Sequence, residues 1–242
     1  MNVTVVDDDL FATAAADALL SRLPAGAPRL GVATGGTPMR LYAELARRSA
    51  AGQIDLSGAV VVALDEYVGL DGGDPHSYAT YVRERIAEPL GIPSANVVVP
   101  LGDTAHPECA AAEFEARIAD VGGVDVQIAG IGSNGHLAFN EPGSPLDSVT
   151  RVVQLSERTR ADNARFFDGQ IEAVPRHAIT QGLATICRAR SILLLASGPG
   201  KADALAAALH GPVGPDVPAS VLQRHSDVTV IADRAVSARM AG

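Results

Sequence analysis

The chain has 242 residues, 47% of them hydrophobic, so it is long enough to bury one substantial core and too apolar to be disordered. Its 28 acidic and 19 basic residues give a net charge of −9, and no basic block occurs, which argues against binding to nucleic acid or to an anionic membrane surface. Because the N-terminus lacks a signal-peptide pattern and no apolar run reaches the ~20 residues of a membrane span, we expect a cytoplasmic protein.

Short apolar, β-branched runs alternate along the chain with Ala-, Leu- and Arg-rich segments of helical period, a pattern typical of a parallel sheet with crossover helices. Strands are expected at Val3–Val6, Leu30–Ala33, Val60–Leu64, Val97–Val99, Val124–Ala129, Ile192–Ala196 and Val228–Ile231. Helices are expected at Leu10–Arg22, Pro38–Ala50, Tyr78–Glu88, Pro107–Ala119, Arg158–Phe167, Ile179–Cys187 and Gly200–His210. We predict a single α/β domain over residues 1–242, with one doubly wound, mostly parallel, Rossmann-like sheet and helices on both faces.

Glycine-rich or polar segments follow four of the predicted strands. They are Thr34–Pro38, Asp65–Tyr67, Gly130–His136 and Ser197–Lys201. In an open α/β sheet, ligands bind at the carboxyl ends of the strands, near a switch in strand order. If the strands are parallel, these four segments meet at one site.

The segment Thr34–Pro38 has the composition of an anion-binding turn before a helix. Thr37 is expected as the N-cap and Pro38 as the first helical residue. Gly35 and Gly36 would let backbone N–H groups approach an anion at the helix N-terminus. Taken by itself, the segment fits a tight turn without a ligand equally well.

Lys201 is the one lysine among the 19 basic residues, and it lies beside a glycine-rich turn at the start of a predicted helix. A cation at that end of a helix opposes the helix dipole unless an anion lies close by. A solvated lysine is the ordinary explanation, but the exclusive use of arginine elsewhere favours a phosphate contact. Arg165 is a weaker candidate, because it could pair with Asp162 three residues earlier.

Asp65 directly follows a strand that is apolar at every position. Partial desolvation there would raise the pKa of the carboxyl group and suit it to proton transfer on carbon. A capping aspartate is the alternative.

The spacing of Gly130, Gly132 and Gly135 matches a dinucleotide-binding fingerprint, but Pro142 and Gly143 leave no room for the long helix that this fingerprint opens. We therefore expect no dinucleotide here.

The same segment presents Asn134, His136 and Glu141 within eight residues. A lone loop histidine is usually an ordinary surface residue. A histidine flanked by an amide and a carboxylate after a buried strand can act as an oriented acid or base.

Together, four segments resemble the glucosamine-6-phosphate deaminase family. They are Thr34–Pro38, Asp65–Leu70, Gly135–Pro142 and Thr159–Phe167, and the resemblance runs in order from about residue 30 to 225. The Asp-Glu-Tyr-Val-Gly-Leu and Phe-Asn-Glu-Pro runs are the most specific. The related 6-phosphogluconolactonases share the Gly-Gly-Thr turn and a Gly-His element but lack the Phe-Asn-Glu-Pro continuation.

The resemblance implies conversion of glucosamine 6-phosphate and water to fructose 6-phosphate and ammonia, in amino-sugar catabolism. It implies that His136, oriented by Glu141, helps to open the sugar ring, with Asn134 beside it, and that Asp65 moves a proton from C2 to C1. The residues implied in substrate binding are Thr34, Gly35, Gly36, Thr37, Glu66, Gly130, Arg165 and Lys201. No metal or organic cofactor is implied, and Cys109 and Cys187 lack the spacing of a zinc site or a disulfide framework.

Three departures from the family pattern bear on regulation and pH dependence. Asn134 stands where many members carry aspartate, so His136 should be harder to protonate. Allosteric hexameric members have a lysine two residues after the arginine that is here Arg151, whereas this chain has Val153. The chain also ends at Gly242, without the longer C-terminal segment of regulated members, so we expect a non-allosteric monomer or small homo-oligomer.

Two alternative functions remain open on the sequence. Galactosamine 6-phosphate differs from the glucosamine substrate only at C4, and no residue that contacts this hydroxyl can be named. A sugar-phosphate-binding regulator without catalysis is the alternative of a different class, and the presence of Asp65, His136 and Glu141 argues against it.

Overall fold

The fold is known from a computed structural model that describes residues 1–237, so the chain end at Gly242 lies outside the described residues. A seven-stranded sheet forms the centre, in the order β1-β10-β9-β6-β2-β3-β5, and every neighbouring pair is parallel. Its strands are β1 (Asn2–Val6), β2 (Arg29–Val32), β3 (Val60–Ala63), β5 (Val97–Val98), β6 (Val126–Gly130), β9 (Ser191–Ala196) and β10 (Val228–Asp233). All seven predicted strands are confirmed, as is the parallel α/β class.

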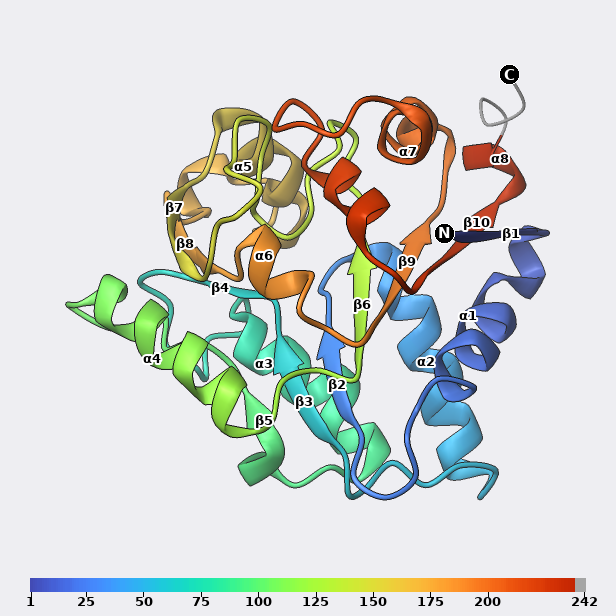
Figure 1. Cartoon of the computed structure of the whole chain (residues 1–242). Helices are drawn as coiled ribbons and strands as arrows, with labels where there is room; N and C mark the ends of the chain where they lie inside the picture. Colours follow the sequence, from blue (N-terminus) through green and yellow to red (C-terminus); the bar gives the residue numbers. More distant parts are fainter. Residues whose placement is uncertain (238–242) are drawn as a thin grey trace.

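Helices cover both faces of this sheet (Figure 1). The α-helices are α1 (Phe11–Leu20), α2 (Gly36–Ala50), α3 (Tyr78–Val82), α4 (Pro107–Asp120), α5 (Glu157–Asn163), α6 (Leu183–Ile186), α7 (Ala202–His210) and α8 (Arg234–Ser237). The predicted helix at Tyr78–Glu88 begins as α3 and continues through one π-helical turn, η2 (Arg83–Ala87). Short 3-10 helices are η1 (Asp8–Leu10), η3 (Glu88–Leu90), η4 (Ser94–Asn96), η5 (Ala164–Phe166), η6 (Ile171–Ala173), η7 (Pro199–Lys201) and η8 (Pro218–Arg224).

Two buried apolar clusters pack on opposite faces of the sheet. One joins α1, α2 and η2 to the strands through residues such as Phe11, Leu41 and Ile86. The other includes Phe114 of α4 and Leu205 of α7. Burial of each apolar face supplies the main driving force for this layered arrangement.

A second, three-stranded antiparallel sheet was not expected from the sequence. Its order is β4 (Asp65–Tyr67), β8 (His177–Thr180) and β7 (Arg151–Gln154). The prediction of a helix at Ile179–Cys187 is therefore wrong over its first residues, and only α6 is helical. A short apolar run does not distinguish strand from helix, and here pairing with two distant strands decides in favour of a strand.

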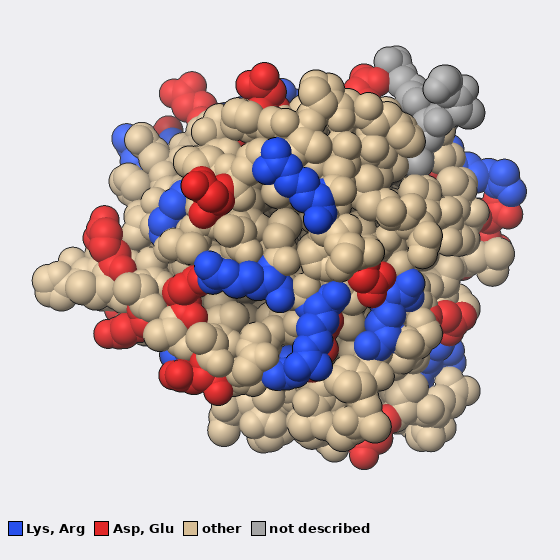
Figure 2. Space-filling model, in the orientation of Figure 1, with Lys and Arg blue, Asp and Glu red and all other residues tan. Residues whose placement is uncertain are grey.

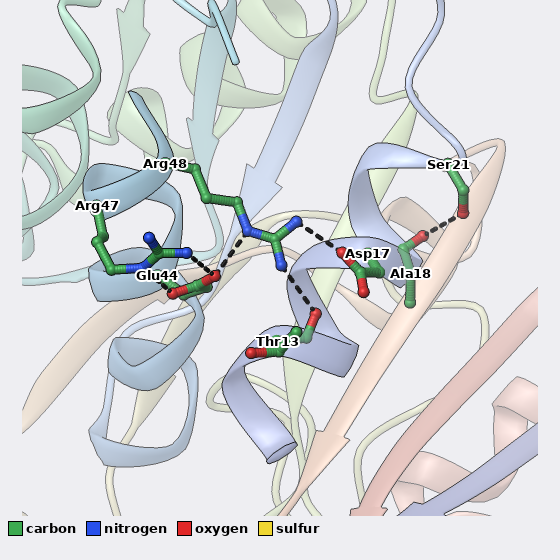
Figure 3. A network of polar contacts seen from close by, with 7 residues as sticks. All are labelled: Thr13, Asp17, Ala18, Ser21, Glu44, Arg47 and Arg48. Carbon is green, nitrogen blue, oxygen red and sulfur yellow. Dashed lines mark hydrogen bonds and ion pairs between the residues drawn. The ribbon is translucent and has the colours of Figure 1, made fainter. Parts of the chain in front are cut away.

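Polar contacts join the two helices on one face, as Figure 3 shows. Arg48 of α2 donates to the Asp17 carboxylate of α1 at 2.6 Å and to Glu44 at 2.7 Å. Glu44 also accepts from Arg47 at 2.7 Å. Hydrogen bonds from Arg47 and Arg48 lower the pKa of Glu44 to about 2, so the carboxylate stays charged at neutral pH.

Charged side chains are dispersed over the face drawn in Figure 2, where the basic residues are separated by uncharged and acidic ones. Asp125, a buried carboxylate, pairs with Arg29 at 2.6 Å and with Arg190 at 3.2 Å. Within residues 1–237, no helix is long and apolar enough to cross a membrane.

Candidate active site

All four segments that the sequence placed at strand ends line one cavity of about 720 Å³. Residues 34–38 follow β2, Asp65 follows β3, residues 130–133 and 136 follow β6, and residues 197–201 follow β9. Helix α5, η5 and residues 75–78 complete the wall. The site therefore lies at the carboxyl edge of the parallel sheet, as the strand-end argument predicted.

Residues 35–37 form a cradle at the N-terminus of α2. Helix α2 begins at Gly36 and its N-cap is Gly35, so the prediction of Thr37 as N-cap and Pro38 as first helical residue is wrong by two positions. Gly35 adopts φ +107°, a conformation that favours glycine, and this lets the helix begin earlier. The Thr37 hydroxyl is thereby free to face the cavity, where it accepts a hydrogen bond from Lys201 Nζ at 3.2 Å.

Lys201 comes to this cradle from the other side of the sheet. It ends η7, directly before α7, and is separated from Thr37 by 164 residues in sequence. Burial lowers the pKa of Lys201, and the positive charge of Arg165 lowers it further. A bound anion would offset both effects on the pKa of Lys201, because its negative charge would compensate the positive charges of Lys201 and Arg165.

Arg165 lines the cavity from η5 but does not pair with Asp162, which the sequence left open. Its guanidinium instead lies over the Phe166 ring, 4.7 Å from the ring centroid. The fork of donors thus remains available at the cavity.

Asp65 is a nearly buried carboxylate at the mouth of the sheet. It is 5% exposed, it lines the cavity, and its Oδ1 has no hydrogen-bond partner. Desolvation, with a smaller contribution from the charge of Glu66, raises the pKa of Asp65 to about 8. A carboxylate so tuned is a stronger base than an exposed one when it is ionised.

His136 lines the cavity with its ring packed against the backbone of Gly132. A methyl group added to Gly132 would come within 2.2 Å of its ring, so only glycine permits this position. Burial lowers the pKa of His136, while the negative charge of Glu141 opposes that shift. The ring Nδ1 is buried without a hydrogen-bond partner.

Neither of the two residues expected beside His136 hydrogen-bonds to its ring. Asn134 Oδ1 accepts from the His136 backbone N–H at 3.2 Å and does not orient the ring. Glu141 does not hydrogen-bond to His136. It accepts from the Ser156 and Thr159 hydroxyls at 3.0 and 2.6 Å, at the start of α5. Glu141 therefore reaches His136 through its charge alone.

Glu66 lies behind the cavity wall and does not line the site. It is 1% exposed and accepts the backbone N–H groups of Tyr67, Tyr78 and Ala79 at 2.8, 2.9 and 2.8 Å. These bonds lower its pKa, but burial is the larger influence and raises it. Glu66 holds the start of α3 against β4.

Sequence reasoning missed an aromatic wall beside Asp65. Tyr67 packs against Tyr78, Phe139 and Phe167 with ring centroids 4.9, 5.6 and 5.6 Å away. Asn163 of α5 donates to the Tyr67 hydroxyl at 3.0 Å. Six of the nine Phe and Tyr residues of the chain line this cavity. Because aromatic residues are rare in this chain, their occurrence near the segments that follow the strands is the sequence signal by which the wall could have been found.

Residues 1–237 contain no group of three or more His, Cys, Asp or Glu side chains that could hold a metal ion.

Comparison with known proteins gives a consistent result. The sequence profile of the family described as "Glucosamine-6-phosphate isomerases/6-phosphogluconolactonase" matches residues 7–231. The chain belongs to this family. Glucosamine-6-phosphate deaminases of Cutibacterium acnes and Streptomyces coelicolor are 50% and 46% identical to it. The alignments cover 97% and 99% of this chain and 90% and 93% of those proteins.

Solved structures of family members share the fold. A monomeric glucosamine-6-phosphate deaminase superposes with a TM-score of 0.95 at 37% identity, over 99% of this chain and 100% of its own. The 6-phosphogluconolactonase of Trypanosoma cruzi superposes with a TM-score of 0.79 at 19% identity, over 100% and 97%. The second likeness shows the fold alone.

The placement of Glu66 generates a prediction that separates support of the fold from contact with a ligand. Glu66→Gln places an amide NH₂ against backbone N–H donors, so the free energy of unfolding should fall by about 1–3 kcal/mol. Urea denaturation measures this change, with Glu113→Gln on the exposed side of α4 as the matched control. Unchanged stability of Glu66→Gln would contradict the role assigned here.

Proposed function

We propose that this protein is a glucosamine-6-phosphate deaminase, converting glucosamine 6-phosphate and water to fructose 6-phosphate and ammonia. One observation carries the proposal. A nearly buried carboxylate that accepts no hydrogen bond on Oδ1, Asp65, shares a cavity with a histidine and with a cationic cradle at a helix N-terminus. That combination suits proton transfer on the carbon of a phosphorylated sugar.

The phosphate group of the substrate is held by the cradle. Backbone N–H groups of residues 35–37 point to the anion at the start of α2, and the Thr37 hydroxyl and Lys201 ammonium lie within hydrogen-bond distance of each other there. Arg165 closes on the phosphate from η5. Thr34 and Gly130 also line the cavity.

Ring opening is assigned to His136. The neutral imidazole takes the proton from O1 and returns it to the ring oxygen, which releases the open aldehyde. Burial favours the neutral form needed at the start, and the charge of Glu141 stabilises the imidazolium that forms in between. Asn134 contributes by holding the His136 backbone.

Isomerisation is assigned to Asp65. Its carboxylate removes the proton from C2, giving an enolamine, and the resulting carboxylic acid delivers the proton to C1. The product is an imine at C2, which water hydrolyses to the ketose and ammonia. The steps are proton transfers, cleavage of the bond between C1 and the ring oxygen, addition of water to the imine and loss of ammonia, so the proposed chemistry uses no cofactor. Glu66 supports it indirectly, through the Tyr67 and Tyr78 backbone and through repulsion that makes Asp65 more basic.

The proposal extends to the molecule as a whole. We take residues 1–237 and the short remainder of the chain as one catalytic domain that works in the cytoplasm. It acts as a monomer, which is the state of its structural relative at 37% identity. The relatives named glucosamine-6-phosphate deaminase support this substrate over galactosamine 6-phosphate and over a regulator without catalysis.

A coupled assay for fructose 6-phosphate tests the activity directly. Glucosamine 6-phosphate should be turned over with release of ammonia, and galactosamine 6-phosphate should react more slowly. Asp65→Asn should lower kcat by at least about 100-fold, because the base is lost, and leave affinity for inorganic phosphate unchanged. Asp147→Asn, on an exposed residue, is the control. Full turnover by Asp65→Asn would rule out the proton transfer assigned to it.

The rate should also depend on pH in a defined direction. Asp65 accepts a proton only as the carboxylate, and its pKa in the free protein is about 8, so kcat/KM should rise with pH up to that value. The ammonium group of bound substrate stabilises the carboxylate, so the same limb of kcat should lie at lower pH. Steady-state kinetics across this range measures both limbs. A kcat/KM already flat well below neutral pH would contradict the raised pKa.

N-acetylglucosamine 6-phosphate should not activate the enzyme. A smaller cavity of about 360 Å³ contains Val153 and Arg151, where allosteric members have a lysine in place of the valine. Arg151 is already engaged by Asn140 Oδ1 at 2.8 Å and Ser144 Oγ at 3.3 Å. Rates at subsaturating substrate should be equal with and without this compound. A clear rise would show that the site works without the lysine.

A further inference from the structure

Asp233 is a buried carboxylate that fastens the turn carrying Lys201. It is the last residue of β10 and is 4% exposed. Its Oδ2 accepts from Ser197 Oγ at 2.7 Å and from the Gly198 backbone N–H at 2.8 Å. Its Oδ1 accepts from the Val236 backbone N–H at 2.7 Å. One side chain thus joins the exit of β9 to the start of α8.

The two bonds to Oδ2 act where the chain changes direction. Gly198 has φ +89°, and the chain then passes through η7 to reach Lys201. Both Ser197 and Gly198 line the cavity, as does Lys201. Holding the peptide before Gly198 therefore sets the path that brings the Lys201 ammonium to the Thr37 hydroxyl across the cradle.

Asp233 also supplies negative charge to a crowded cationic site. Among the described residues, the charges of Arg165 and Asp233 act on the pKa of Lys201. Lys201 in turn lowers the pKa of His136. Burial and Arg165 both favour the neutral amine, and Asp233 opposes them. Its own pKa is kept low by the Ser197 and backbone hydrogen bonds, against the effect of burial.

We propose that Asp233 is a positioning residue for substrate binding, which acts through Lys201 by fixing the Ser197–Lys201 turn. This inference rests on the assignment of Lys201 to the phosphate group. Through Asp233, strand β10 supports the phosphate cradle, although Asp233 itself does not line the cavity.

Asp233→Asn tests the proposal, with inorganic phosphate as the probe. Each carboxylate oxygen accepts a backbone N–H, Oδ2 from Gly198 and Oδ1 from Val236, so an asparagine NH₂ must face one of these donors and lose its bond. Calorimetry should show phosphate affinity reduced about tenfold, the effect of losing a hydrogen bond to a charged group. KM for glucosamine 6-phosphate should rise similarly, while kcat stays within about twofold.

The pH dependence separates this role from support of the fold. Without the negative charge the pKa of Lys201 falls further, so the loss of phosphate affinity at alkaline pH should begin at lower pH in Asp233→Asn. Ser197→Ala removes one hydrogen bond and keeps the carboxylate. It should weaken phosphate binding a few-fold without moving that alkaline limb. Asp55→Asn, which removes a carboxylate bonded to Ser57 far from the cavity, should match the original protein.

Several outcomes would overturn the inference. Removing Asp233 takes a negative charge away from a bound anion, so unchanged or tighter phosphate binding by Asp233→Asn would mean that repulsion outweighs positioning. An alkaline limb that stays in place would refute the effect on Lys201. If Asp233→Asn does not fold, unchanged phosphate affinity in Ser197→Ala refutes the positioning of the turn. Failure of the unaltered protein to bind phosphate or to release ammonia would instead count against the proposed function.

Discussion

The site depends on the segment where the chain crosses from the parallel sheet into the antiparallel sheet. Strand β3 ends at Ala63 inside the parallel sheet, and two residues later the chain enters the antiparallel sheet as β4. Gln181 holds this crossing, because its side-chain amide donates to the Ala63 carbonyl at 2.7 Å and its backbone N–H donates to Leu64 at 2.8 Å. Asp65 is therefore fixed where a largely buried strand meets an open cavity. A carboxylate in that position is desolvated by the protein itself, which is the physical origin of its raised pKa.

The rest of the cavity separates the requirements of binding from those of proton transfer. Positive charge and the N-terminus of α2 lie at the cradle of residues 35–37 and Lys201, whereas the aromatic wall around Tyr67 lies beside Asp65. The wall excludes water around Asp65, and the cradle provides fixed donors for an anion. A net charge of −9 is thus compatible with the phosphorylated ligand proposed above, because two cations and a row of backbone N–H groups are concentrated at the cradle.

Supporting residues connect these parts to distant elements of the fold. Glu141 joins the loop after β6 to the start of α5, Glu66 joins β4 to α3, and Asp233 joins β10 to the turn after β9. Each is a carboxylate that accepts several donors, and each lies one layer behind a residue that faces the cavity. Such groups keep functional side chains in place because a buried carboxylate that loses its donors is costly.

The sequence by itself determined the parallel sheet, its seven strands and the four segments that meet at its edge, because strand-length apolar runs and glycine-rich turns are local signals. It also singled out Asp65, His136 and Lys201, by their neighbours along the chain. Only the tertiary structure decided that residues 177–180 form a strand, that Gly35 caps α2, and that Glu66 and Glu141 hold backbone and hydroxyl groups. Such outcomes depend on contacts between residues far apart in the chain; Gln181 and Ala63, for example, are 118 residues apart. No local pattern encodes which distant donor a carboxylate will meet.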